Sequence, residues 1–176
     1  MPGPPKIVGH DGNHAVGQWG SIVVAVWRYV AVADAAKRVQ RVFKAAQEDG
    51  VPAGHIGVIE PECEVPGSDV RAVFERMMKD TRRGMDGAAL VLEGGGFAAS
   101  TARAVITGLT LVARPPVPIK TYAEVTPAAD WLIPYLVQHG AQLGPAKELI
   151  EFVARLRETI PRRAQPARVA PVTGQS

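Results

Sequence analysis

The sequence predicts an α/β fold in which a mixed sheet carries helices on its faces. Short apolar runs rich in β-branched residues alternate with longer segments whose apolar residues recur every three or four positions. The first two runs are close enough to form an antiparallel hairpin. A helical segment separates each later pair of runs, which indicates mostly parallel strands. With 176 residues, 47% hydrophobic and 21% charged, the chain suits one domain with a sizeable core.

The N-terminal part of the chain predicts an irregular segment followed by the hairpin. Residues 1–12 are rich in Pro and Gly, which favour irregular backbone. His14–Gln18 is a candidate first strand, and Gly17–Gly20 a candidate turn. Ser21–Trp27, "SIVVAVW", is rich in β-branched and aromatic residues and is typical of a strand.

Two helices and a strand are expected next. Val32–Glu48 places apolar side chains at helical spacing, and Asp49-Gly50 ends it. His55–Ile59 is a short strand. A second helix, capped by Ser68 or Asp69, is expected to run to about Arg83.

The following segments predict the centre and the far edge of the sheet. Gly87–Leu92 is apolar throughout, which suits a central strand covered on both faces. Ala98–Ala113 has helical spacing, and Ile119–Val125 is a further strand. Pro127 begins a helix in which Pro134 is expected to cause a kink or an early end.

The C-terminal part predicts an extra helix and a basic tail beyond an α/β domain at residues 13–138. Residues 144–160 carry an apolar stripe, and residues 161–176 are expected to be disordered. This tail holds three of the 20 basic residues and no acid, which leaves 17 basic against 17 acidic residues elsewhere. The excess charge therefore lies in the tail and not on a folded face, so nucleic acid is not an expected partner.

The compartment expected from the sequence is the cytoplasm. No apolar run is long enough to span a bilayer, and the N-terminus lacks the pattern of a signal peptide. Cys63 is the only cysteine, so no internal disulfide can form.

The stretch "VLEGGGFAAS" raises the main functional question. Gly94-Gly95-Gly96-Phe97-Ala98-Ala99 fits the pattern G-x-G-x-x-A between a predicted strand and a predicted helix, where glycines can admit a pyrophosphate. Glu124 would then be the candidate for holding a ribose. Against this, the motif lies past the midpoint of the chain, and no Walker lysine follows it. We favour a tight turn over a nucleotide site.

The chain resembles a bacterial STAS-like family, related to the anti-sigma-factor antagonists. The resemblance covers residues 14–137 and rests on "VWRYV", "VIEPECEVP", "LVLEGGGFAASTARAVITGLTLVARPPVPIK" and "AADWL". It implies a sheet with helices on its faces that binds partner proteins and does no catalysis. In the antagonists a Ser or Thr at the start of the helix after a central strand is phosphorylated. Ser100 and Thr101 are the nearest hydroxyls here, but the family's acidic residue before paired serines is replaced by Gly-Phe-Ala-Ala-Ser-Thr.

The functional prediction is a non-enzymatic, cytoplasmic interaction or regulatory module without a cofactor, acting through the glycine loop and the following helix. A protein is the expected partner, and a homo-oligomer is compatible with the sequence. The expected binding residues are Glu93, Gly94, Gly95, Gly96, Phe97, Ser100, Thr101 and Arg103, with Ser100 and Thr101 as possible phosphorylation sites. Two alternatives stay open: a small-molecule, anion or nucleotide-binding protein or enzyme that uses Gly94–Phe97, and an assembly component that docks through the C-terminal helix.

Other candidate residues favour structural interpretations. Glu60, Glu62 and Glu64 could share a face and bind a hard cation, but a solvated loop is the simpler explanation. The glutamates beside Cys63 disfavour a reactive thiolate. A metal-ligand spacing separates His10 and His14, and no catalytic partner is evident for His55 or His139. We expect the three tryptophans to pack in the fold: Trp19, Trp27 and Trp131. Arg114 is expected near a helix C-terminus.

Overall fold

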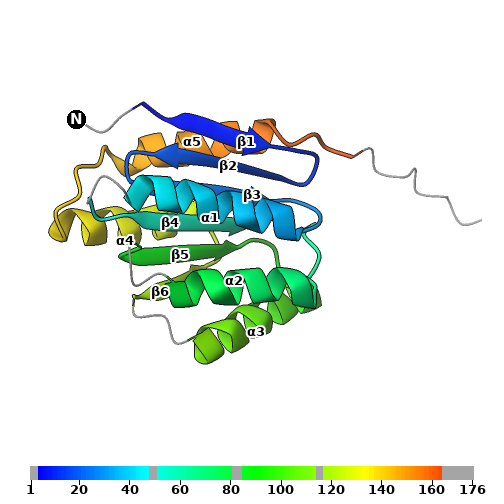
Figure 1. Ribbon diagram of the computed structural model, residues 1–176. Helices are drawn as coiled ribbons and strands as arrows, with labels where there is room; N and C mark the ends of the chain where they lie inside the picture. The colour runs from blue at the N-terminus through cyan, green and yellow to red at the C-terminus, as the bar shows by residue number, and fades with distance from the viewer. Residues whose placement is uncertain (1–3, 48–50, 81–84, 114–116, 164–176) are drawn as a thin grey trace, which may run out of the picture.

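The strands form one six-stranded sheet in the order β1-β2-β3-β4-β5-β6. The computed structural model describes residues 4–47, 51–80, 85–113 and 117–163 (Figure 1). The strands are β1 (Lys6–His10), β2 (His14–Trp19), β3 (Ile22–Trp27), β4 (Gly54–Ile59), β5 (Gly87–Leu92) and β6 (Ile119–Tyr122).

The sheet is antiparallel at its N-terminal edge and parallel beyond it. β1, β2 and β3 pair antiparallel, and β3, β4, β5 and β6 pair parallel. The mixed sheet and its N-terminal hairpin were therefore predicted correctly. The predicted turn at Gly17–Gly20 was wrong, because β2 continues to Trp19. The chain reverses at Gly20, whose φ of 55° suits a residue without a side chain.

Helices cover both faces of this sheet. They are α1 (Ala33–Gln47), α2 (Ser68–Asp80), α3 (Gly96–Ala113), α4 (Val125–Gln138) and α5 (Ala146–Glu158). Figure 1 shows α1 and α2 in front of the sheet, α3 beside α2, and α4 and α5 behind the sheet. The predicted layers are confirmed.

Each face of the sheet has its own hydrophobic core. Behind the sheet, residues of α4 and α5 such as Leu132 and Phe152 pack on β3, β4 and β5. In front, residues of α1 such as Val39 and Phe43 pack on β2 and β3. The C-terminal helix α5 thus packs on its own domain.

The three tryptophans differ in burial. Trp19 and Trp27 are buried, as expected of core residues. Trp131 is half-buried and stacks on Tyr135 at 5.5 Å between ring centroids.

Three predicted boundaries are corrected by the structure. Residues 1–12 are not irregular throughout, because Lys6–His10 forms β1, an edge strand that pairs through its backbone with β2. The strand expected over Ile119–Val125 ends at Tyr122, and Glu124 is the N-cap of α4. Pro134 does not end its helix, since α4 continues to Gln138. The tail expected to be disordered from residue 161 is placed through Arg163, whose N–H donates to the hydroxyl of Tyr29 at 2.8 Å. Expectations for Arg114 and for residues 164–176 fall outside the described residues.

Candidate functional site

The carboxyl ends of the central parallel strands place three charged residues in a row. The last residues of β3, β4 and β5 are in register, so the residues that follow them, Arg28, Glu60 and Glu93, lie side by side. The backbone pairing extends into this row: the N–H of Glu60 donates to the carbonyl of Trp27 at 2.9 Å.

Arg28 and Glu60 form the inner ion pair of this row. Their side chains are 7% and 6% exposed. Nη2 of Arg28 donates to Oε1 of Glu60 at 3.0 Å, Nε donates to Oε2, and Nη1 donates to the carbonyl of Ile160. The hydrogen bonds that Arg28 donates to the Glu60 carboxylate raise the pKa of Arg28. A buried charge removed from its partner is costly, so this pair is expected to stay closed.

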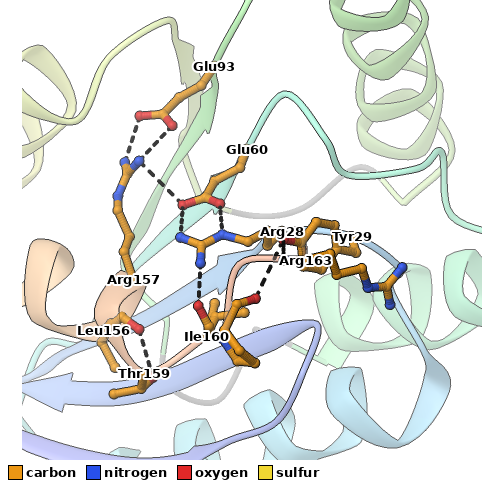
Figure 2. Close-up of polar contacts among 10 residues, drawn as sticks. Arg28, Tyr29, Glu60, Glu93, Leu156, Arg157, Thr159, Ile160 and Arg163 are labelled. Carbon is orange, nitrogen blue, oxygen red and sulfur yellow. Dashed lines mark hydrogen bonds and ion pairs between the residues drawn. The ribbon is translucent and has the colours of Figure 1, made fainter. Parts of the chain in front are cut away.

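Arg157, near the end of α5, forms the outer ion pair. Its Nη2 and Nη1 donate to the two carboxylate oxygens of Glu93 at 2.6 and 2.8 Å. Nη1 also reaches Oε1 of Glu60 at 3.4 Å. Figure 2 shows Arg157 spanning the two carboxylates. This forked geometry raises the pKa of Arg157. The four residues together form a neutral network that ties α5 to the sheet.

The predicted glycine loop follows directly on this network. Gly94 has a φ of +83°, a conformation that glycine adopts easily, and a Cβ there would lie 3.0 Å from Pro61. A Cβ on Gly95 would have no heavy atom within 4 Å, so that position is open. α3 begins at Gly96, two residues earlier than expected. Gly94 thus provides the bend against the neighbouring loop, Gly95 is open, and Gly96 already belongs to α3.

The remaining predicted binding residues lie in the first two turns of α3. Ser100 and Arg103 are exposed, and Thr101 is half-buried. The side chain of Phe97 lies outside what the structure describes. Glu93 differs from the others, because its carboxylate is held by Arg157 and is 21% exposed. The structure therefore places Glu93 in the ion-pair network and the other described side chains on α3.

Among the α3 side chains that the structure describes, the exposed ones lie on one side of the helix, which we call the α3 face. They recur at the spacing of a single helix side: Ser100, Arg103, Ala104, Thr107, Gly108 and Leu111. Leu111 is 69% exposed. Arg103 is the only charged residue in the 18 residues of α3. An exposed helix face usually carries several charges, so a face with one charge and an exposed leucine is unusually poor in charge for a solvated surface.

The acidic segment after β4 corrects one expectation. Glu60 does not lie in a solvated loop, because it is buried against Arg28, whereas Glu62 and Glu64 are exposed. Among the described residues no group of three potential ligands could hold a metal ion.

The thiol of Cys63 is unreactive at neutral pH. Burial and the neighbouring glutamates raise the pKa of Cys63 to about 12, so its thiol is protonated at neutral pH.

The histidines occupy structural positions. Nδ1 of buried His55 lies 2.9 Å from the carbonyl of Val23, and burial lowers its pKa to about 4. His14 lies in β2, with Nδ1 2.9 Å from Oδ2 of Asp11, and its ring stacks on Trp27. Burial lowers the pKa of His14, opposed by Asp11. His139 is exposed at the end of α4, where Nδ1 lies 2.7 Å from the carbonyl of Tyr135.

Sequence reasoning missed Arg28 and Arg157. A signal for the row was present, because each of three apolar runs is followed at once by a charged residue: "VVAVWR", "GVIE" and "LVLE". Parallel strands bring such residues to one edge of a sheet. Arg157 had no such signal, since it is 64 residues from Glu93 along the chain.

No family model, curated protein or solved structure matches this chain. Within the part of the chain that the structure describes, no helix has both the length and the apolar character that a membrane crossing requires.

Proposed function

We propose that this protein is an interaction module that binds another protein through the Glu93–Gly96 turn and the α3 face. The observation that carries the proposal is that this exposed face has a single charge and an exposed leucine, Leu111. α1 has five charged residues, and α2 and α5 have six each, whereas α3 has one. A helix face of this kind is typical of a surface that another polypeptide covers.

The packing of α3 supports the same proposal. None of its side chains whose burial is described is buried, and none of those belongs to either hydrophobic core. Its small exposed residues, Ala104 and Gly108, would let a partner approach the helix backbone closely. The turn before it is held in place while Glu93 is bound to Arg157. A rigid surface lowers the entropic cost of binding.

The two alternative functions receive less support. A nucleotide crevice in such folds opens where the strand order reverses, and β3-β4-β5-β6 runs without reversal. An assembly role for α5 would need a free apolar stripe, but its buried residues, Leu149, Phe152, Val153 and Leu156, pack within this chain.

The proposal can be tested by placing a charge on the α3 face. Gly108 is exposed, and a Cβ there meets no heavy atom within 4 Å, so Gly108→Arg fits the fold. We expect it to weaken partner binding by about 100-fold, since an interface centre tolerates a bulky unpaired charge poorly. The partner is first captured from native cell extract with wild-type protein and identified. Its affinity for each purified variant is then measured by isothermal titration calorimetry.

Two matched variants define the result. Ala154→Arg places the same charge on the exposed side of α5, behind the sheet, and is expected to bind like wild type. Gly95→Arg places it in the open turn and is expected to weaken binding as Gly108→Arg does. Equal affinity of wild type, Gly95→Arg and Gly108→Arg, with circular dichroism unchanged, would contradict the proposal.

A further inference from the structure

The C-terminal end of α5 and the residues after it lie across the carboxyl edge of the sheet. Arg28 donates to the carbonyl of Ile160, and the N–H of Arg163 donates to the hydroxyl of Tyr29 at 2.8 Å. The guanidinium of Arg163 also lies 4.3 Å from the centre of the Tyr29 ring. Figure 2 shows these contacts beside the Arg157 pair. Residues 156–163, which we call the C-terminal clasp, are thus held at several points.

The clasp reaches the base of the proposed binding surface at one residue. Arg157 binds both oxygens of Glu93, and Glu93 is followed directly by Gly94 and the turn into α3. Arg157 also reaches Glu60, which precedes Pro61, the residue against which Gly94 packs. One guanidinium therefore holds both loops that define the turn.

The two ion pairs of the network differ in accessibility. The Arg28–Glu60 side chains are 7% and 6% exposed, whereas those of Arg157 and Glu93 are 28% and 21% exposed. Opening the outer pair lets water reach both charges, while opening the inner pair would leave charges buried. The outer pair can accordingly open while the sheet and the inner pair stay intact.

We propose that Arg157 is a positioning residue through which the C-terminal clasp sets the start of α3 and thereby controls the proposed partner-binding surface. Its regulatory meaning rests on the proposed function, but the coupling itself is a property of the isolated chain. A lysine cannot replace Arg157, because a single ammonium does not reproduce the forked contact with Glu93. Any event that draws the clasp away, such as an acidic partner group binding Arg157, would loosen the first turns of α3.

Hydrogen–deuterium exchange of the full-length chain tests this coupling. The first amides of a helix lack intrahelical partners and exchange rapidly in any case, so the informative peptides cover residues 100–106. In Arg157→Gln we expect these amides to exchange about tenfold faster, the effect of losing a charge-assisted hydrogen bond. Peptides from β3 and β4 should be unchanged. Unchanged exchange at 100–106 would overturn the proposal.

Three further variants make the result specific. Arg155→Gln removes an exposed arginine from the same helix, two residues away, and should leave exchange at 100–106 as in wild type. Arg157→Lys should behave like Arg157→Gln. Glu93→Gln removes the carboxylate of the outer pair and leaves Arg157 in contact with Glu60. This variant tests the coupling even if Arg157→Gln destabilises the whole domain. Faster exchange in Glu93→Gln confined to 100–106 supports the coupling, and exchange that is unchanged or raised everywhere contradicts it.

Partner affinity separates this inference from the proposed function. If Gly108→Arg abolishes binding while Arg157→Gln leaves exchange at 100–106 unchanged, the surface is correct and the coupling is wrong. If Arg157→Gln loosens α3 but Gly108→Arg binds the partner normally, the coupling is correct and the surface is wrong.

Discussion

α3 and α4 are alike in having few charges but differ in the burial of the side chains that the structure describes. Each contains a single charged residue, Arg103 in α3 and Asp130 in α4. α4 lies against the sheet and buries six residues: Val125, Ala128, Ala129, Leu132, Ile133 and Leu136. α3 lies beside α2, and none of its side chains whose burial is described is buried.

An apolar helix can thus be covered by different surfaces in different places of one molecule. Few charges indicate that a helix is covered, but they do not say by what. For α4 the cover is the sheet of its own chain, and its apolar residues stabilise the fold. For α3 no described side chain belongs to either core, and we propose that a partner covers its exposed ones. The comparison predicts that equal substitutions in the two helices have unequal effects.

The largest contrast is expected from leucine truncation. Leu132→Ala opens a cavity in the core under α4 and should lower the free energy of unfolding by about 2–5 kcal/mol. Leu111→Ala removes an exposed side chain and should change it by less than about 0.5 kcal/mol. Urea unfolding followed by circular dichroism measures both. A large loss in Leu111→Ala would mean that α3 belongs to the core.

Acid should lower the free energy of unfolding through His55, which packs on Phe43 in the core in front of the sheet. No described residue of α3 belongs to that core, so changes in α3 should not alter the acid effect. His55 is neutral when folded, with a pKa of about 4, whereas an unfolded histidine titrates near 6.5. The unfolded chain therefore gains a proton first as the pH falls, so stability is full above about pH 6.5. It should drop by about 3 kcal/mol as the pH falls towards 4.

The measurement is urea unfolding at several pH values for wild type, Leu111→Ala and His55→Phe. Leu111→Ala should keep the acid loss of wild type, and a folded His55→Phe should lose much of it. An acid loss of the same size in folded His55→Phe would contradict this assignment.

Glycine replacement gives small individual effects, and their signs are opposite. A Cβ on Gly54, under α4, would lie 2.6 Å from Cδ1 of Leu136, so Gly54→Ala should destabilise the protein by about 1–3 kcal/mol. Gly108 on α3 has open space, and Gly108→Ala should stabilise the helix by about 0.5–1 kcal/mol. Thermal unfolding distinguishes the two. Destabilisation by Gly108→Ala would show an unrecognised contact at α3.

The sequence predicted most of the fold because its periodicities are local. The apolar runs at Ser21–Trp27 and Gly87–Leu92 predicted β3 and β5, and the helical spacings predicted all five helices. β1 was missed because the Pro- and Gly-rich start of the chain outweighed "KIVGH", an edge strand that pairs mainly through its backbone. The strand predicted to Val125 was too long, because Glu124 is extended but serves as an N-cap.

The candidate site was only partly predictable for a different reason. Glu93 and the three glycines have a local pattern, and the sequence identified them. Arg28 and Glu60 join them only through the register of parallel strands, and Arg157 only through the packing of α5. Contacts between distant segments leave no periodicity in a single sequence, so the ion-pair network required the structure.

Labelling of a cysteine placed at Leu111 tests whether a partner covers the α3 face. Leu111→Cys and the control Ala154→Cys are treated with a maleimide as purified proteins and inside intact cells; Cys63, with its pKa of about 12, contributes little background. We predict fast labelling at both positions in the purified proteins and slow labelling at 111 alone inside cells. Equally fast labelling of both positions inside cells would contradict the account.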